Sequence, residues 1–136
     1  MNELTRNNDS FLSVRFPAVS GFLRLSRLNA TAFASSLGFD VDALDDLRLA
    51  VDEAVTWLMN DEEAGGSITL TMSETVGAPG LQLIAERTGD GLAERPVGEL
   101  VHAIFGATVD SYRFDAAAEP GRRRSVRLEK FVGGAE

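Results

Sequence analysis

The chain has 136 residues, of which 44% are hydrophobic, and a formal net charge of -8. This composition suits one domain with a buried core, whereas the acidic charge argues against nucleic acid as a direct partner, because phosphate binding usually needs a basic surface. Cysteine is absent, which excludes a disulfide framework, a thiolate zinc site and a cysteine nucleophile. No apolar leader and no run of about 18 apolar residues occur, so we expect a soluble, cytoplasmic protein without a membrane segment.

The first part of the chain predicts a strand followed by a helix. Residues 1–10 and 133–136 are expected to be flexible tails around a single domain over residues 11–132. The stretch FLSVRF (residues 11–16) alternates apolar and polar residues before Pro17, which predicts a strand. Between Ala18 and Leu37 apolar residues recur at three- and four-residue steps. They predict a helix with one apolar stripe, comprising Phe22, Leu25, Leu28, Ala32 and Phe33.

A second helix is predicted to begin at Asp40 or Asp42, either of which can cap it, and to end before Gly65 and Gly66. Its apolar stripe comprises Leu44, Leu47, Val51, Ala54, Val55 and Leu58. At about 100° per residue, Glu53 and Trp57 lie together on one edge of this stripe. From the pattern alone, they are a solvated carboxylate and a half-buried indole.

The second half of the chain changes to a strand-like period. Residues 67–73 and 80–86 alternate in polarity and are joined by the turn-rich ETVGAPG, which predicts an antiparallel hairpin. The glycine-rich RTGDGL then leads into a short apolar helix over residues 98–105, followed by strands in TVDSYRF and RSVRLEKF. The order β-α-α-β-β-α-β-β predicts a two-layer α/β sandwich with the helices on one face of the sheet.

The run LRLAVDEAVT (residues 47–56), together with the opening VRFPAVSGFLRLSRLNATAFASSLGF, resembles the RsbW-type anti-sigma factors of the GHKL ATPase superfamily. This resemblance implies a GHKL (Bergerat) fold. It also implies a helix in which a general-base glutamate is followed four residues later by an asparagine that holds Mg²⁺ on ATP. Glu53 matches the glutamate, but Trp57 replaces the asparagine, and an indole offers no oxygen ligand to a metal. Asn60 lies about 60° away around the helix and is a poor substitute.

The resemblance also implies an Asp-x-Gly-x-Gly box, whose aspartate accepts a hydrogen bond from adenine, and a glycine-rich lid. Gly89 and Gly91 match the glycines, but Arg87, which has donors only, replaces the aspartate. Loss of this hydrogen bond costs about 1–3 kcal/mol, and here a donor also faces a donor, so adenine affinity is expected to fall at least about tenfold to a hundredfold. The lid segment LAERPVGEL keeps only Gly98. Together these changes predict a domain with no bound metal or ATP, in which Trp57 fills the vacated nucleotide pocket.

Partner binding does not depend on the nucleotide. Arg27 matches a family arginine that contacts both the sigma factor and its antagonist, although Arg24 is a competing assignment. From the pattern alone, each is an exposed arginine on an amphipathic helix. The basic run Arg122–Arg124 is expected to be a solvated strand edge. His102 lacks the spacing of a metal ligand or of a catalytic histidine.

The resemblance implies a degenerate kinase that acts in transcription regulation and stress response. The chain is expected to sequester an RNA polymerase sigma factor and to release it when an anti-anti-sigma (STAS-type) protein competes. The alternative is an active protein-serine kinase that phosphorylates this antagonist with Mg²⁺-ATP, with Glu53 as general base. A small-molecule sensor that reuses the pocket has no positive feature in its favour. A homodimer is compatible with the resemblance, but no residue requires it.

Overall fold

The computed structural model describes residues 11–60, 64–92, 95–119 and 121–133. The expected tail at 1–10, and all of the expected tail at 133–136 except Gly133, therefore lie outside the described residues. The observed order of helices and strands confirms the predicted one, with a short 3-10 helix added. The elements are β1 (Phe11–Pro17), η1 (Ser20–Phe22), α2 (Leu23–Ser36), α3 (Val41–Met59), β2 (Ser67–Glu74), β3 (Gly80–Leu92), α4 (Glu99–Thr108), β4 (Ser111–Glu119) and β5 (Gly121–Phe131).

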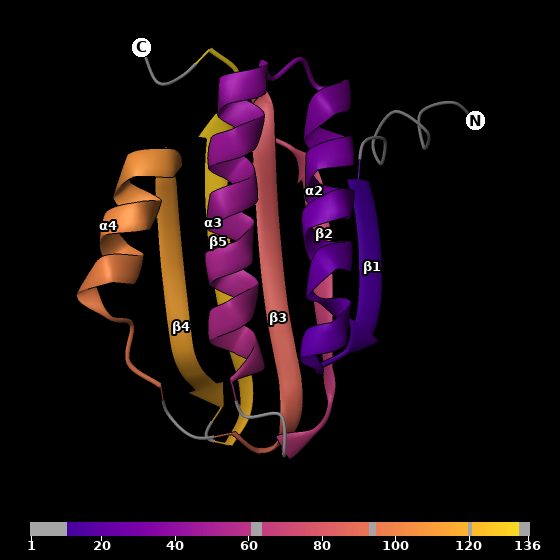
Figure 1. The fold of residues 1–136 in the computed structure, drawn as a ribbon, viewed down its shortest axis with the longest axis vertical. Helices are drawn as coiled ribbons and strands as arrows, with labels where there is room; N and C mark the ends of the chain where they lie inside the picture. Colours follow the sequence, from indigo (N-terminus) through magenta and orange to yellow (C-terminus); the bar gives the residue numbers. More distant parts are fainter. Residues whose placement is uncertain (1–10, 61–63, 93–94, 120, 134–136) are drawn as a thin grey trace.

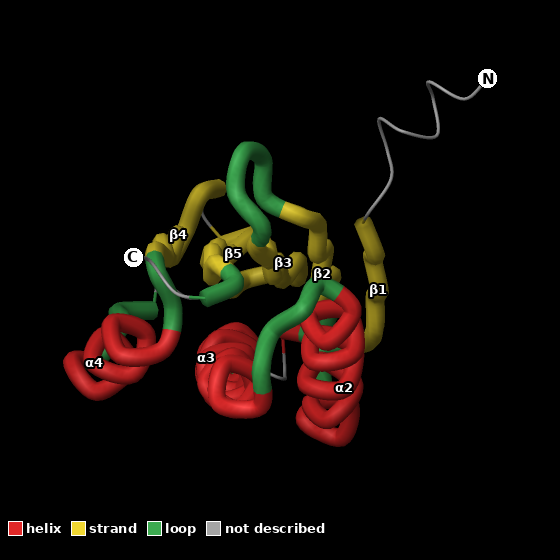
Figure 2. Tube along the Cα trace, turned by 90° about the horizontal axis from the view of Figure 1, so that it is seen from above, coloured by secondary structure: helices red, strands yellow, loops and turns green. Residues whose placement is uncertain are grey.

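The strands form one antiparallel sheet in the order β1-β2-β3-β5-β4. The helices α2, α3 and α4 cover the same face of this sheet, with α3 between α2 and α4 (Figures 1 and 2). The predicted two-layer α/β sandwich is therefore confirmed. No helix in the described part of the chain is long and apolar enough to span a membrane.

The core lies between α3 and the middle of the sheet. Leu47, Val51 and Leu58 of α3 are fully buried against inward-facing residues of β2 and β3, such as Leu70 and Leu83. The start of α3 is fixed by Asp40, whose carboxylate accepts a hydrogen bond of 2.8 Å from the backbone N–H of Ala43. Of the two predicted caps, Asp40 is therefore the one used.

The apolar stripe predicted for the first helix is wrong, because α2 buries a different face. Its buried residues are Ser26, Ala30 and Ala34, four residues apart, whereas Leu25 and Leu28 are 40% and 55% exposed. Small side chains let the α2 backbone approach α3 and the sheet closely, so larger residues cannot occupy the contact face. The predicted stripe of Phe22, Leu25, Leu28 and Ala32 points outward, and Phe33 is half-buried.

The glycine-rich RTGDGL was predicted to connect the hairpin to the short helix. It is instead the last part of β3. That strand runs to Leu92, and its pairing with β5 shifts register between Thr88 and Leu92. An irregularity of this kind bends a strand and often requires glycine. The short helix predicted near residues 98–105 is confirmed as α4, with Gly98 at its N-cap.

Candidate functional site

Trp57 lies in the last turn of α3 and joins four parts of the fold. It is 4% exposed, so it is buried rather than half-buried. Its indole N–H donates a hydrogen bond of 3.2 Å to the carbonyl of Pro96, in the segment before α4. The ring meets Phe114 of β4 edge-on, with 4.9 Å between centroids, and the guanidinium carbon of Arg124 of β5 lies 5.6 Å from the ring centre. Trp57 therefore holds the segment before α4 against the sheet.

Arg87, on β3, is fully buried beneath the end of α3. Its Nη1 and Nη2 atoms donate hydrogen bonds of 2.8 Å each to the carbonyl oxygens of Leu58 and Gly65. The last carbonyls of a helix have no partner within the helix and form the negative end of its dipole, so a cation is favourable there. Arg87 therefore stabilises the end of α3. The inward alternation of Leu81, Leu83 and Ala85 could have indicated this buried position from the sequence.

Arg124 lies directly opposite Arg87 in the β3–β5 ladder and is also fully buried. The expectation of a solvated edge is therefore wrong for Arg124. Arg123 fits it, since this side chain is exposed and pairs with Glu86 at 3.2 Å. Arg124 is buried because side chains alternate between the two sides of a strand, and Arg124 lies on the same inward side as Val126. The face of the Trp57 indole can stabilise the buried cation.

Of the two glycines predicted as remnants of a nucleotide box, Gly89 lies with Gly66 at a close approach between backbones, whereas a Cβ atom on Gly91 would have no neighbour within 4 Å. A Cβ atom on Gly66 would lie 1.8 Å from the carbonyl oxygen of Thr88, and one on Gly89 would lie 3.0 Å from that of Gly65. Gly91 has a φ of +73°, which disfavours other residues. Contacts and backbone geometry within the chain therefore account for both glycines without a ligand.

The side chains at the expected nucleotide positions do not fit Mg²⁺-ATP. The Trp57 N–H is a donor already used by Pro96, and Arg87 presents donors where adenine recognition needs an acceptor. The amide of Asn60 donates to the carbonyl of Thr56 within the end of α3. Among the described residues, no group of three or more His, Cys, Asp or Glu side chains could hold a metal ion. Glu53, the expected general base, is half-buried on α3.

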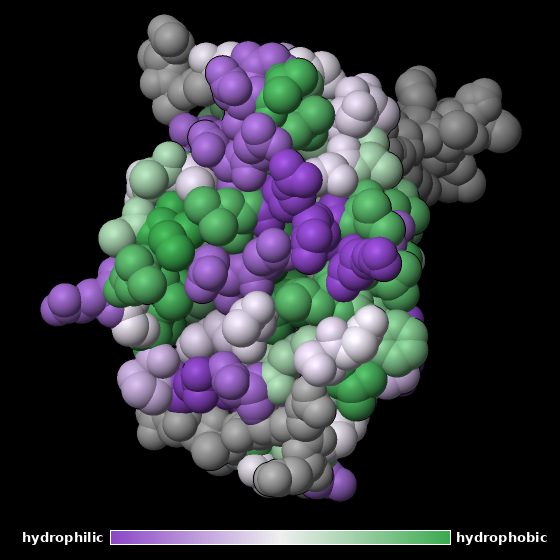
Figure 3. Space-filling view, viewed as in Figure 1, coloured by the Kyte–Doolittle hydropathy of each residue, from purple (hydrophilic) through white to green (hydrophobic). Residues whose placement is uncertain are grey.

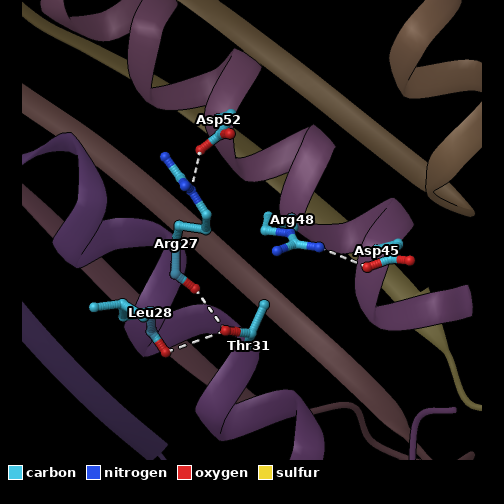
Figure 4. Close-up of polar contacts among 6 residues, drawn as sticks. All are labelled: Arg27, Leu28, Thr31, Asp45, Arg48 and Asp52. Carbon is cyan, nitrogen blue, oxygen red and sulfur yellow. Dashed lines mark hydrogen bonds and ion pairs between the residues drawn. The ribbon is translucent and has the colours of Figure 1, made fainter. Parts of the chain in front are cut away.

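Arg27, the expected partner-binding residue, bridges α2 and α3 (Figure 4). Its Nε atom lies 3.1 Å from a carboxylate oxygen of Asp52, and the two side chains are 35% and 32% exposed. Arg24, the competing assignment, is exposed on α2. Nearer the start of α3, Arg48 pairs with Asp45 at 2.6 Å. A polar strip thus crosses the helix layer.

An apolar surface lies beside this polar strip. We call the exposed residues Leu25, Leu28 and Ala32 of α2, together with Phe22 at its N-cap, the outer face of α2. Figure 3 shows apolar patches on the α2 and α4 sides of the helix layer, separated by hydrophilic groups along α3. Single exposed apolar residues are common, but a contiguous set along one helix face is typical of an interaction surface.

Comparison with known proteins gives relatives of one kind, although no protein-family model matches the chain. A serine-protein kinase RsbW from Oceanobacillus iheyensis is 26% identical over 114 residues, which cover 74% of this chain and 72% of that protein. The RsbW of Bacillus subtilis is 33% identical over 51 residues, and that of Listeria monocytogenes serotype 4b (strain F2365) is 38% identical over 45 residues. These shorter matches cover 32% and 29% of the relatives' lengths.

Proposed function

The chain is a homologue of the serine-protein kinases named RsbW and has a GHKL-like α/β sandwich, and from this kinship we propose that it is a cytoplasmic anti-sigma factor. It binds a sigma factor of RNA polymerase, and an anti-anti-sigma protein of the STAS type competes for it. Because the two complexes exclude each other, the concentration and affinity of the antagonist set the amount of free sigma factor.

We further propose that this switch works without ATP-dependent phosphorylation. The observation that carries this proposal is the filling of the expected nucleotide positions by the chain's own core. Trp57 is 4% exposed and hydrogen-bonded to Pro96, while Arg87 is fully buried and bonded to two carbonyls. ATP would have to displace both side chains, at the cost of their packing and hydrogen bonds.

The outer face of α2 is the surface that we assign to the partners. It offers apolar area, Arg24 extends it, and Arg27 lies at its border with α3. Along α3, an excess of acidic side chains, Asp42, Asp45, Asp46, Asp52 and Glu53, is only partly balanced by arginines. This charge suits a basic partner surface and would speed association more than it tightens the complex.

The proposal predicts that Mg²⁺-ATP does not bind. Isothermal titration of the purified protein with millimolar Mg²⁺-ATP should give no saturable heat, because the pocket is filled from within. A sigma factor from the same genome should bind with the same affinity with or without nucleotide. Incubation with labelled ATP should leave the serine residues of the antagonist unmodified.

Micromolar ATP binding would contradict this prediction and would favour the active kinase, with Glu53 as general base. In that case Glu53→Gln should abolish phosphate transfer to the antagonist while nucleotide binding is kept. Restoring an aspartate by Arg87→Asp is not a usable control, because it would place a carboxylate against the carbonyl oxygens of Leu58 and Gly65.

Partner binding should depend on the outer face of α2. Leu28 is 55% exposed, so Leu28→Glu should fold normally but weaken the sigma complex at least about thirtyfold, as expected for about 2 kcal/mol at an interface centre. The matched control is Val76→Glu, since Val76 is 99% exposed at the β2–β3 turn. Equal affinities of the two variants, measured by titration, would place the partner elsewhere.

A further inference from the structure

A pair of arginines lies on the face of the sheet that the helices leave open. Arg113 of β4 and Arg127 of β5 are directly opposite each other in the ladder, and both are exposed. They line a hollow of about 310 Å³, together with Ile84, Glu86, Asp115 and Ser125. Like charges directly opposite on neighbouring strands destabilise a sheet. The pair therefore lowers stability unless something else compensates it.

The nearby carboxylates are largely engaged elsewhere. Glu86 pairs with Arg123 at 3.2 Å, and the carboxylate of Glu129 accepts hydrogen bonds from Gln82 at 3.3 Å and Ser111 at 3.4 Å. Within the described parts of the chain, no ion pair involves Arg113 or Arg127. Asp115, opposite Ser125, is the remaining carboxylate on the hollow. Two guanidinium groups thus face one uncommitted carboxylate.

We propose that this hollow binds a small molecule through a carboxylate or phosphate group held between Arg113 and Arg127. Guanidinium groups bind such oxyanions through two parallel hydrogen bonds, and a bound anion would remove the repulsion between the arginines. The Ser125 hydroxyl supplies a further donor, and Ile84 an apolar wall. Within the hollow the arginine pair is only partly compensated, by Asp115, and a feature that costs stability is expected at a functional position.

The site lies apart from the surface assigned to the partners. The outer face of α2 belongs to the helix layer, which covers one side of the sheet (Figure 2). The residues that line the hollow alternate along the strands with buried residues such as Ala85 and Val126, so the hollow is on the opposite side of the sheet. A ligand there need not compete with a sigma factor directly. The inference therefore does not rest on the anti-sigma proposal, and it adds a small anionic ligand to the chain's interactions.

The test uses thermal unfolding of the whole chain at constant ionic strength, with inorganic phosphate and glutamate as separate probes. We expect at least one probe to raise the melting temperature of the wild type in a saturable manner. Arg127→Gln should be at least as stable as the wild type without the probe, because the repulsion is gone, and should bind it at least tenfold more weakly. Asp115→Asn should bind it more tightly. Arg48→Gln, which changes an exposed arginine on the helix side, should bind like the wild type.

The two probes distinguish the source of the oxyanion. Saturation by phosphate alone would identify a phosphate group as the ligand, and saturation by glutamate alone a carboxylate. The proposal is overturned if neither probe saturates, or if Arg127→Gln keeps the wild-type response. It is also overturned if sedimentation shows that Arg127→Gln dissociates a dimer while no probe stabilises the protein, since the face would then bind a second copy of the chain.

Discussion

Trp57→Ala is expected to lower the free energy of unfolding by about 3–5 kcal/mol, the range found for large aromatic residues removed from a core. Trp57 is 4% exposed, and its ring contacts Phe114 at 4.9 Å between centroids. Its removal leaves a cavity between α3 and β4 and frees the carbonyl of Pro96 from its hydrogen bond. A domain of this size has a free energy of unfolding of about 5–15 kcal/mol in total. The variant should therefore fold, but it should unfold at a much lower urea concentration than the wild type.

Far-ultraviolet circular dichroism should follow this unfolding, because Trp57 is the only tryptophan and fluorescence is lost with it. Trp57→Phe keeps a ring beside Phe114 but loses the N–H donor, so it should cost only about 1–2 kcal/mol. Val76→Ala, at a residue 99% exposed, is the control and should stay within about 0.5 kcal/mol of the wild type. A loss below about 1 kcal/mol for Trp57→Ala would mean that the indole is not packed in this way.

Arg87→Ala is expected to have a comparable effect, about 3–5 kcal/mol, for a polar reason. The side chain is fully buried and donates two hydrogen bonds of 2.8 Å, to Leu58 at the end of α3 and to Gly65. Hydrogen bonds from a charged group contribute about 1.5–3 kcal/mol each, and the carbonyl oxygens would lose their donors. Urea unfolding at several salt concentrations measures the loss, which should hardly change with salt because the site is buried.

Two further variants separate packing from hydrogen bonding at Arg87. Arg87→Met restores most of the volume but no donor, so it should recover only part of the lost stability. Arg123→Ala removes a neighbouring arginine that is exposed and paired with Glu86, and should cost at most about 1 kcal/mol, falling with added salt. If Arg87→Met were as stable as the wild type, the hydrogen bonds to α3 would contribute nothing measurable.

The candidate site was predicted from the sequence only in part. The resemblance to RsbW-type proteins led to Glu53, Trp57 and Arg87 as the positions to inspect, and the kinship is supported by the relatives. It did not reveal that Arg87 bonds to the end of α3. Such a contact joins residues 29 positions apart, and it depends on how far α3 extends over the sheet.

The sequence by itself determined the order of helices and strands, because the periods of the apolar residues and the helix cap at Asp40 are local properties of the chain. Only the tertiary structure decided which face of α2 is buried. Steps of three and four residues fit both the Leu25–Leu28 side and the Ser26–Ala30 side, and the close approach of α3 and the sheet admits only small side chains. The position of Arg124 opposite Arg87 was decided in the same way, since the register of β5 against β3 joins residues that are far apart in the chain.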